Sequence, residues 1–363
     1  VLVRPSYVLG GQGMEIAYTE ANIREYMRII GRQEQEHPIL VDKYMMGREV
    51  EVDAVSDGED ILIPGIMEHI ERAGVHSGDS ISVYPPPTLS KKRMEEITDV
   101  THKLAQALHI KGLMNIQYVI SNEKLYVIEV NPRASRTVPY ISKVTGVPFI
   151  DLAIDAALGK KVKDLGCGTG LYPTGDIFAV KVPVFSFEKL PQVEVSLGPE
   201  MKSTGEVLGV SRDYNEAVLK GLLGAGVNVP YDGGKVIMTI APNDKAESVP
   251  IGAVLDYLGF EIYATEGTAN YLNFNFVAAN KIDGLGSEGY NIKDLIESDE
   301  VKLIINTPTR GRSPMNDGFK IRRMAVERRI PCLTSLDTAK ALVHCLKLRK
   351  GPGDLEPIDM QEI

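Results

Sequence analysis

The stretch Leu125-Tyr126-Val127-Ile128-Glu129-Val130-Asn131-Pro132-Arg133 decides which fold and which site the sequence predicts. Its alternation with a period of two residues predicts a β-strand on which Glu129, Asn131 and Arg133 share one face. Pro132 has no backbone N–H group, so it ends the pairing of this strand with a neighbour. A carboxylate, an amide and a guanidinium are therefore expected to leave one strand end together.

The register of a predicted β-hairpin determines which residues join this group. Residues 112–120 predict a second strand, and the polar segment 121–124 predicts the turn between the two strands. A three-residue loop places Gln117 opposite Glu129, whereas a two-residue loop places Gln117 opposite Ile128. The second register sends the two polar side chains to different faces of the sheet, and the sequence leaves both registers open.

Gln117, Glu129 and Asn131 carry oxygen atoms that suit a hard divalent cation such as Mg²⁺, whose shell usually includes phosphate oxygens. The two amides are neutral, which fits a site where a nucleotide brings the negative charge. Arg133 follows them and can hold an anionic substrate, or the phosphoryl group in transfer, through paired hydrogen bonds. The alternative is a buried strand whose polar end makes structural pairs, because ion pairs also gather at strand ends.

Three further segments could contact a nucleotide. Arg4 precedes a glycine-rich turn at residues 5–13, where backbone N–H groups can approach phosphate oxygens, although an ordinary hairpin turn is the alternative. Lys43, Met45 and Glu49 could border an adenine ring and a ribose. Alternating carboxylates over residues 49–53 are, however, more typical of a solvated strand face. Residues 71–80 predict a polar loop, and loops held by strands often bind ligands.

The composition indicates a soluble globular protein of 363 residues, of which 44% are hydrophobic and 25% charged. A net charge of −9 argues against nucleic-acid and membrane partners. No apolar run approaches the roughly 20 residues of a membrane helix. The three cysteines lack metal-binding spacing and fit a reducing cytoplasm. Because the chain starts at Val1 inside an apparent strand, we expect it to be part of a larger protein and inactive alone.

Four motifs together resemble the second ATP-grasp unit of the carbamoyl-phosphate synthetase large-subunit family. In chain order they are RPSYVLGG (residues 4–11), EHIERAGVHSGDS (68–80), MNIQY (114–118) and VIEVNPRASRTVP (127–139). The segment LGPEMKSTGEVLG at residues 197–209 resembles the linker of the same family. The resemblance implies ATP-dependent phosphorylation of carbamate to carbamoyl phosphate for arginine and pyrimidine biosynthesis, in a complex with a glutaminase small subunit.

The resemblance also implies roles for single residues. The nucleotide-binding residues would be Arg4, Lys43, Met45, Glu49, Gly74, Val75, His76, Ser77, Gln117 and Glu129. The divalent ion, Mg²⁺ or Mn²⁺ bound together with ATP, would be held by Gln117, Glu129 and Asn131. Arg133 and Arg136 would act on the carbamate, which derives from bicarbonate, and on the phosphoryl group.

From residue 235 onward, strands and helices alternate, which predicts a doubly wound parallel sheet with ligands at the carboxyl ends of its strands. The segments TEGT (residues 265–268) and NTPT (306–309) follow two of these strands. This part resembles the methylglyoxal synthase-like regulatory domain of the same family. The resemblance implies a site for a phosphorylated effector formed by Lys245, Thr265, Thr268, Lys281, Asn306 and Thr307. Ordinary turns and helix caps are the alternative for these residues.

We therefore expect an α/β protein in which an α+β ATP-grasp portion precedes a doubly wound parallel-sheet domain. Its expected domains are the C-terminal part of an ATP-grasp domain (residues 1–160), an extension and linker (161–232) and a methylglyoxal synthase-like allosteric domain (233–363). Two other functions are considered: another ATP-grasp carboxylase or ligase, which would need a further domain such as a biotin carrier, and a non-catalytic nucleotide sensor, which would have broken metal ligands. An oligomer is possible.

Overall fold

The computed structural model describes residues 1–6, 10–11, 13–30, 38–190, 193–308 and 316–360. The chain forms two compact units, which are described one at a time. The first comprises Val1–Tyr44, Val184–Gly205 and Leu222–Leu355, and the second comprises Met45–Pro183, Glu206–Gly221 and Glu356–Ile363. Parts of two predicted motifs, at residues 7–9 and at Thr309, lie outside the described residues. No helix within the described ranges is long and apolar enough to cross a membrane.

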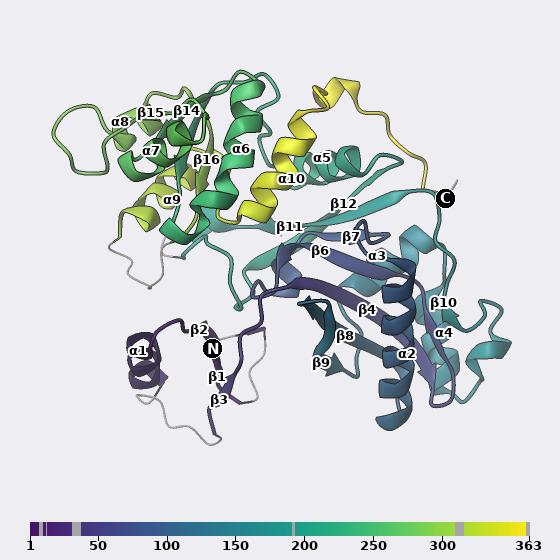
Figure 1. Cartoon of the computed structure of the whole chain (residues 1–363). Coiled ribbons are helices and arrows are strands. Elements are labelled where there is room, and N and C mark those ends of the chain that lie inside the picture. The colour runs from purple at the N-terminus through teal and green to yellow at the C-terminus, as the bar shows by residue number, and fades with distance from the viewer. Residues whose placement is uncertain (7–9, 12, 31–37, 191–192, 309–315, 361–363) are drawn as a thin grey trace. The chain divides into compact units, whose positions relative to one another are not determined.

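The second unit is built around β4, which pairs with β5, β6 and β8, while β8 also pairs with β9 (Figure 1). The sheet is mostly antiparallel, because the described pairings run antiparallel except that of β10 with β5. Its strands are β4 (Arg48–Asp57), β5 (Ile61–Ile63), β6 (Ile66–Arg72), β7 (Ser82–Tyr84), β8 (Lys111–Ser121), β9 (Lys124–Asn131), β10 (Gly170–Leu171), β11 (Phe178–Phe185) and β12 (Ser203–Ser211). The helices that accompany it are α2 (Lys91–Ala107), α3 (Thr137–Thr145), α4 (Phe149–Ala157) and α5 (Tyr214–Gly224).

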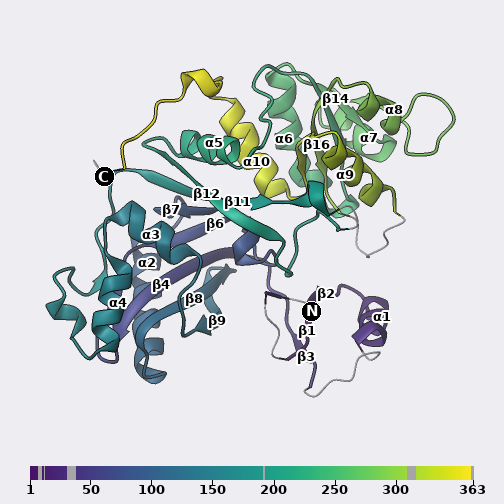
Figure 2. The same ribbon diagram turned by 180° about the vertical axis from the view of Figure 1, so that it is seen from behind.

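The two faces of this sheet have different partners, which follows from the alternation along β4. Val50, Val52 and Ala54 point to one face and join a hydrophobic core with Ile97 of α2. Val55 points to the other face and joins a second core with α3 and α4. Figure 2 shows these two helices from behind. The residues of β4 that share this second face with Val55 are Glu49, Glu51, Asp53 and Asp57, so Val55 is the one apolar side chain of β4 on it.

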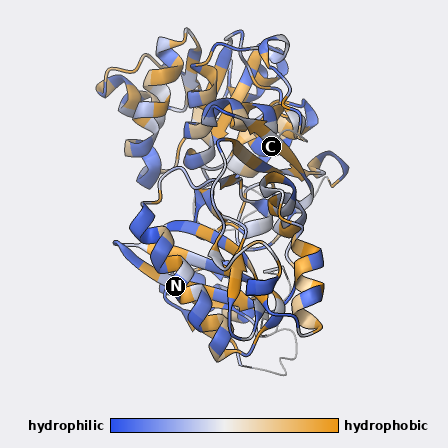
Figure 3. Cartoon of the chain, turned by 90° about the vertical axis from the view of Figure 1, so that its right-hand side faces the viewer, coloured by the Kyte–Doolittle hydropathy of each residue, from blue (hydrophilic) through white to orange (hydrophobic). Residues whose placement is uncertain are grey.

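The helix α2 shows how the local sequence fits this packing. Ser90 caps its N-terminus, because the Ser90 hydroxyl accepts a hydrogen bond of 3.3 Å from the backbone N–H of Arg93. Ile97, Thr101 and Ala105 recur every four residues and are buried on one side. Figure 3 shows the resulting alternation of hydrophilic and hydrophobic residues along the helices.

The first unit contains two parts. A small antiparallel sheet has the order β2–β1–β3, with the bounds β1 (Leu2–Arg4), β2 (Glu15–Ile16) and β3 (Leu40–Asp42). Its core is formed by Val3 of β1, by Ala17 and by Tyr26 of helix α1 (Glu20–Ile30). The larger part is a five-stranded parallel sheet with the order β15–β14–β13–β16–β17.

The parallel sheet has helices on both faces, as the alternating pattern predicted. Its strands are β13 (Lys235–Thr239), β14 (Glu261–Ala264), β15 (Asn280–Lys281), β16 (Val301–Asn306) and β17 (Cys332–Leu333). Its helices are α6 (Lys245–Tyr257), α7 (Glu266–Phe274), α8 (Ile292–Glu297), α9 (Asp317–Glu327) and α10 (Leu336–Leu346). Ile237 and Ile304 pack against α8 and α9, whereas Ile262 faces α6. The predicted α/β class and the doubly wound sheet are therefore confirmed.

Candidate active site

The β8–β9 hairpin combines the two registers that the sequence left open. Ser121 pairs with Lys124, so the turn has only two residues, Asn122 and Glu123, and both have positive φ angles, of 49° and 57°. One extra residue in β9, Ile128, forms a bulge between the pairs Tyr118–Val127 and Gln117–Glu129. The loop is therefore short, yet the bulge restores the register that places Gln117 opposite Glu129.

This register collects the proposed metal ligands at the end of the hairpin. Asn115 lies opposite Asn131, one pleat beyond the Gln117–Glu129 pair. The Asn131 Nδ2 atom donates a hydrogen bond of 2.8 Å to Glu129 Oε1, which joins the amide and the carboxylate. The available donors are oxygen atoms with one formal charge, which fits a hard divalent cation whose remaining ligands are phosphate oxygens. No cluster of three His, Cys, Asp or Glu able to hold a metal occurs among the residues described.

The loop after β6 lies against Gln117. Gln117 Nε2 donates a hydrogen bond of 2.7 Å to Ser77 Oγ, and Lys181 Nζ donates one of 3.0 Å to the Ser77 carbonyl. His76 Nδ1 accepts a hydrogen bond of 3.0 Å from the Gly78 N–H group. Burial lowers the pKa of His76, which favours the neutral ring. The structure thus brings His76 and Ser77 of the predicted nucleotide loop to the hairpin, whereas Gly74, with a φ of 114°, provides the turn.

The two arginines that the sequence predicts for the site lie in the loop after β9. Arg133 is exposed, and its backbone N–H group donates a hydrogen bond of 2.8 Å to the Asn131 carbonyl. Arg136 is also exposed and occupies the N-cap position of α3 without a capping bond from its side chain. Both guanidinium groups therefore belong to one short loop at the end of the hairpin, where solvent and small anions can reach them.

The carboxylates of β4 correct one expectation, because they are not a solvated face. Glu49 and Glu51 are each only 4% exposed, and Asp53 is 1% exposed. They face His69 of β6, whose Nε2 atom lies 3.4 Å from Glu51 Oε2, and the charge of the buried Lys181 on β11 also acts on Glu51. These partners lie far away in the sequence, which explains why the strand pattern alone predicted exposure.

The buried side chains of Glu49, Glu51 and His69 differ in the direction in which their pKa values are shifted. Burial, helped by neighbouring carboxylates, raises the pKa of Glu49 to about 7. Burial opposes ionisation of Glu51 too, but its hydrogen bond with His69 and the charges of His69 and Lys181 outweigh that effect and lower its pKa to about 2. Burial by itself would lower the pKa of His69, but the hydrogen bond with Glu51 and the nearby carboxylate charges outweigh it, so the pKa of His69 is raised. We conclude that Glu51 and His69 form the ionised pair, while Glu49 can take up a proton.

The remaining predicted nucleotide residues are divided between the units. Arg4 on β1 donates a hydrogen bond of 2.8 Å from Nε to Asp42 Oδ2, and Lys43 is exposed after β3. Both belong to the first unit, whereas Met45 and Glu49 begin the second. The grouping of all four into one nucleotide site stays a prediction.

The six predicted effector residues fall into two groups at the carboxyl edge of the parallel sheet. Three are buried and have structural partners: the Thr268 hydroxyl accepts from Ile240 N at 3.2 Å, the Thr307 hydroxyl accepts from Ala241 N at 2.7 Å, and Asn306 Nδ2 donates to Thr239. The other three lie at the rim, where Lys245 Nζ donates to the Gly267 carbonyl at 2.7 Å, Lys281 pairs with Glu266, and Thr265 precedes α7 without a side-chain cap bond.

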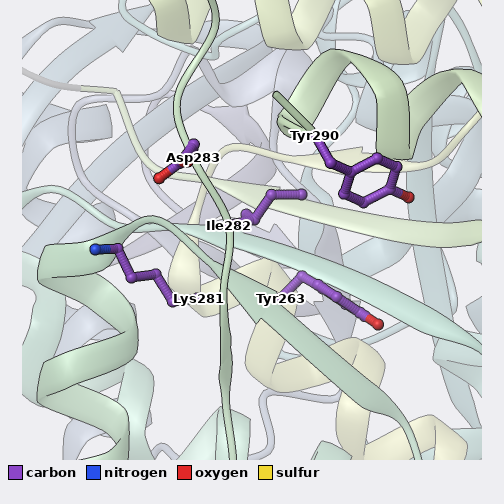
Figure 4. Close-up of a pocket in the computed structure, with 5 residues that line it drawn as sticks. All are labelled: Tyr263, Lys281, Ile282, Asp283 and Tyr290. Atoms are coloured by element: carbon purple, nitrogen blue, oxygen red, sulfur yellow. The ribbon is translucent and has the colours of Figure 1, made fainter. Parts of the chain in front are cut away.

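A shallow pocket of about 320 Å³ adjoins Lys281 on the α8 side of the sheet. Its other lining residues are Tyr263, Ile282, Asp283 and Tyr290. Figure 4 shows the two tyrosine rings on one side of Ile282, while the Lys281 ammonium group points away from them. Tyr290, which belongs to no predicted motif, is 58% exposed, so the pocket is open to solvent.

Comparisons with known proteins cover both units. Residues 1–165 match the family model described as carbamoyl-phosphate synthase L chain, ATP binding domain, and residues 247–334 match the model of the MGS-like domain. The chain is 57% identical over 363 residues to the carbamoyl phosphate synthase large chain of Lachnoclostridium phytofermentans, and 55% identical over 360 residues to that of Clostridium perfringens. These alignments cover 100% and 99% of this chain but 34% of each relative.

The chain therefore spans about a third of the length of the curated relatives it matches. Among solved structures, a biotin carboxylase from Campylobacter jejuni is similar over 64% of this chain and 56% of that chain, with 17% sequence identity and a TM-score of 0.46.

Proposed function

Because residues 1–165 belong to the family of ATP-binding domains of carbamoyl-phosphate synthase L chains and residues 247–334 to the MGS-like domain family, we propose that this chain phosphorylates carbamate as part of a carbamoyl phosphate synthase large chain. The observation that carries the proposal is the register of the β8–β9 hairpin, which places Gln117 opposite Glu129 and leads directly to Arg133. The intact set of donors favours this function over a non-catalytic sensor, and the family favours it over another ATP-grasp carboxylase or ligase.

In the proposed reaction, a carbamate oxygen attacks the γ-phosphorus of ATP, the bond from that phosphorus to the β–γ bridging oxygen breaks, and ADP leaves. The Arg133 guanidinium holds the carbamate and compensates the charge on the transferred phosphoryl group. Arg136 adds a second positive charge at the same loop. Glu129, Asn131 and Gln117 would hold the divalent ion, Mg²⁺ or Mn²⁺, which supplies charge neutralisation on the phosphates.

Hydrogen bonds from two strands hold the loop that borders this site. Ser77 is held from two sides, by Gln117 and by Lys181, so the loop at residues 74–77 is fixed beside the hairpin.

We also propose that the enzyme is cytoplasmic and that a glutaminase small subunit supplies the ammonia for the carbamate. Oligomers of that complex are part of the same proposal.

Substitution of Arg133 tests the proposed role in the full-length large chain. Arg133→Met should lower the rate of ATP synthesis from ADP and carbamoyl phosphate by about 100-fold, because a charge that acts on the transition state is lost. Arg133→Lys should retain part of the rate, since it keeps the charge but not the paired geometry. Lys103→Met, at an exposed position of α2, is the matched control for loss of a positive charge. A normal rate in Arg133→Met would contradict the assignment.

The MGS-like part is proposed to bind a phosphorylated effector at the rim of the parallel sheet. The N-terminal turn of α7 directs backbone N–H groups to this rim, and Lys245 and Lys281 add positive charge. Thr268, Asn306 and Thr307 would support the site from below, given their buried positions. Coupling between such a site and catalysis typically amounts to about 1–3 kcal/mol.

Calorimetric titration of the full-length large chain with inorganic phosphate and with nucleoside monophosphates tests the effector site. Lys245→Ala should weaken binding of the effector by about tenfold, because one charge-assisted contact is removed. Lys293→Ala, on an exposed position of α8, is the control for removal of a lysine from the same domain. Equal affinities in both variants, or no heat with any phosphorylated compound, would place regulation elsewhere.

A further inference from the structure

The loop that carries the two proposed substrate-binding arginines is attached to the sheet through Asp53. Asp53 Oδ2 accepts a hydrogen bond of 2.9 Å from the Ser135 hydroxyl and one of 2.5 Å from the Thr137 hydroxyl. The Ser135 hydroxyl also accepts a hydrogen bond of 3.1 Å from the Thr137 N–H group. Ser135 and Thr137 flank Arg136, so one carboxylate oxygen fixes the backbone on both sides of that residue.

The other oxygen of Asp53 connects the same carboxylate to the hairpin. Asn115 Nδ2 donates to Asp53 Oδ1 at 3.0 Å and to Glu51 Oε1 at 2.9 Å. In the sheet Asp53 lies opposite Asn115, and Asn115 lies opposite Asn131. A straight row across β4, β8 and β9 therefore starts at the anchor of the arginine loop and ends at a proposed metal ligand.

The anchor lies at the buried end of an otherwise exposed loop. Its outward residues 132–134 are exposed, as is Arg136, whereas Thr137 is only 2% exposed. Arg136 gives the N-terminus of α3 no side-chain cap bond. The buried Asp53 is surrounded by donors instead: burial and the Glu51 charge raise its pKa to about 6, and the bonds from Thr137, Ser135 and Asn115 limit that rise. Hydrogen bonds to a desolvated carboxylate are stronger than those between neutral groups.

We propose that Asp53 is a positioning residue for carbamate phosphorylation, which fixes Arg133 and Arg136 relative to the metal-binding end of the hairpin by holding Ser135 and Thr137. This inference rests on the proposed function, because the arginines that Asp53 positions are the groups proposed to bind the carbamate. It assigns no contact between Asp53 and substrate. It predicts that weakening the anchor misplaces the guanidinium groups without removing the nucleotide site. A displacement of about 1 Å can lower a rate by about 100-fold.

Three variants of the full-length large chain test the proposal. Asp53→Asn removes the charge and puts an amide nitrogen either opposite Asn115 Nδ2, where two donors meet, or toward the two hydroxyl groups, which must then accept a hydrogen bond instead of donating one to a carboxylate. Thr137→Val removes one hydroxyl at nearly constant volume, and Thr137→Ser keeps it. We expect Asp53→Asn and Thr137→Val to lower kcat for ATP synthesis from carbamoyl phosphate by about 10- to 100-fold, with the KM for ADP within twofold of normal. Thr137→Ser should retain most of the rate.

Matched controls separate positioning from stability. Asp57→Asn removes another buried carboxylate of β4, which accepts from backbone N–H groups of residues 59, 60 and 162 and does not contact the loop. Thr98→Val removes a hydroxyl from α2 that bonds only within its helix turn. Both controls should keep kcat. Hydrogen exchange should accelerate at the amides of residues 133–137 in Asp53→Asn, while β8 stays protected.

The outcomes distinguish this inference from the function on which it rests. If Arg133→Met abolishes activity while Asp53→Asn and Thr137→Val keep normal kcat and normal exchange at residues 133–137, Asp53 does not position the loop. Should Asp53→Asn fail to fold, Thr137→Val with Thr137→Ser still decides the matter. If Arg133→Met itself has no effect, the proposed function fails, but faster exchange at residues 133–137 would still show that Asp53 anchors the loop.

Discussion

Glu129→Gln in the full-length large chain is expected to lower the rate of ATP synthesis from ADP and carbamoyl phosphate by about 1000-fold, which corresponds to about 4 kcal/mol of transition-state stabilisation. Glu129 supplies the only formal negative charge among Gln117, Glu129 and Asn131, so the variant leaves three neutral amides. These cannot compete for a divalent ion with water as a carboxylate does. Because Glu129 is exposed at the end of β9, the fold should persist.

Glu123→Gln is the matched control, since Glu123 lies in the turn of the same hairpin with a side chain that is 88% exposed. It should leave the rate unchanged. The assay is run over a range of Mg²⁺ concentrations, because loss of a proposed metal ligand should also raise the concentration needed for the half-maximal rate. A Glu129→Gln enzyme with a near-normal rate and ordinary Mg²⁺ dependence would remove Glu129 from the metal site.

The hairpin shows how far the sequence predicts the site. The period of two residues predicted both strands and the face that Glu129 and Asn131 share, and the structure confirms them. The register could not be predicted, because it depends on a two-residue turn and on a bulge at Ile128, two features that act in opposite directions on the pairing. A bulge changes the pairing by one residue without any marked signal in a strand of apolar residues.

The buried charges of β4 show where prediction failed. The pattern EVEVD at residues 49–53 favours a solvated face, because alternating carboxylates on a strand are usually exposed. In the fold, His69 from β6 and Asn115 from β8 face them, and the charge of Lys181 from β11 acts on them as well. Burial of charge requires partners, and partners from distant strands are visible only once the sheet has formed. Asp53 and its anchor were missed for the same reason.

The parallel sheet presents the opposite case. Alternating strands and helices predicted its topology, because βαβ units impose parallel strands with helices on both faces. Which residues at its edge remain available to a ligand was not predictable from the motifs TEGT and NTPT. Thr268 and Thr307 accept hydrogen bonds from backbone N–H groups after β13, whereas Lys245 lies at the rim.

The second large effect is expected at the ion pair between the buried Arg322 of the MGS-like part and Glu194, which precedes β12 in the chain. Arg322 of α9 is 3% exposed and donates from Nε to Glu194 Oε1 at 2.7 Å and from Nη1 to Asn306 Oδ1 at 2.5 Å. A second bond to Glu194 makes the pair bidentate. Glu194→Ala leaves the guanidinium buried without its counter-charge, and we expect a loss of about 3 kcal/mol in the free energy of unfolding. This is the lower end of the usual range, because the Glu194 side chain is 34% exposed.

Comparison with Arg322→Met isolates the cause of this loss. That variant removes the charge together with the pair, so it should cost less than Glu194→Ala, and the double variant Glu194→Ala/Arg322→Met should be more stable than Glu194→Ala alone. Native-state hydrogen exchange at the amides of α9 measures the local free energy in each protein without requiring the whole chain to unfold at once. Equal stabilities of Glu194→Ala and the double variant would show that no uncompensated charge is left.

The pH dependence gives an independent check on the same pair. Burial opposes ionisation of Glu194, but the hydrogen bond from Arg322 outweighs it, together with a backbone bond and nearby positive charges, and lowers its pKa. The stabilisation is therefore fully present above the ordinary glutamate pKa of about 4.3 and is lost as the pH falls through the lowered value. In Glu194→Ala this contribution is absent, so the protection of α9 between pH 7 and pH 3 should fall less steeply than in the unaltered protein. Parallel curves would mean that the bond does not couple protonation to folding. Because Arg322 also holds Asn306, the unaltered protein should lose order at the proposed effector site over the same acidic range.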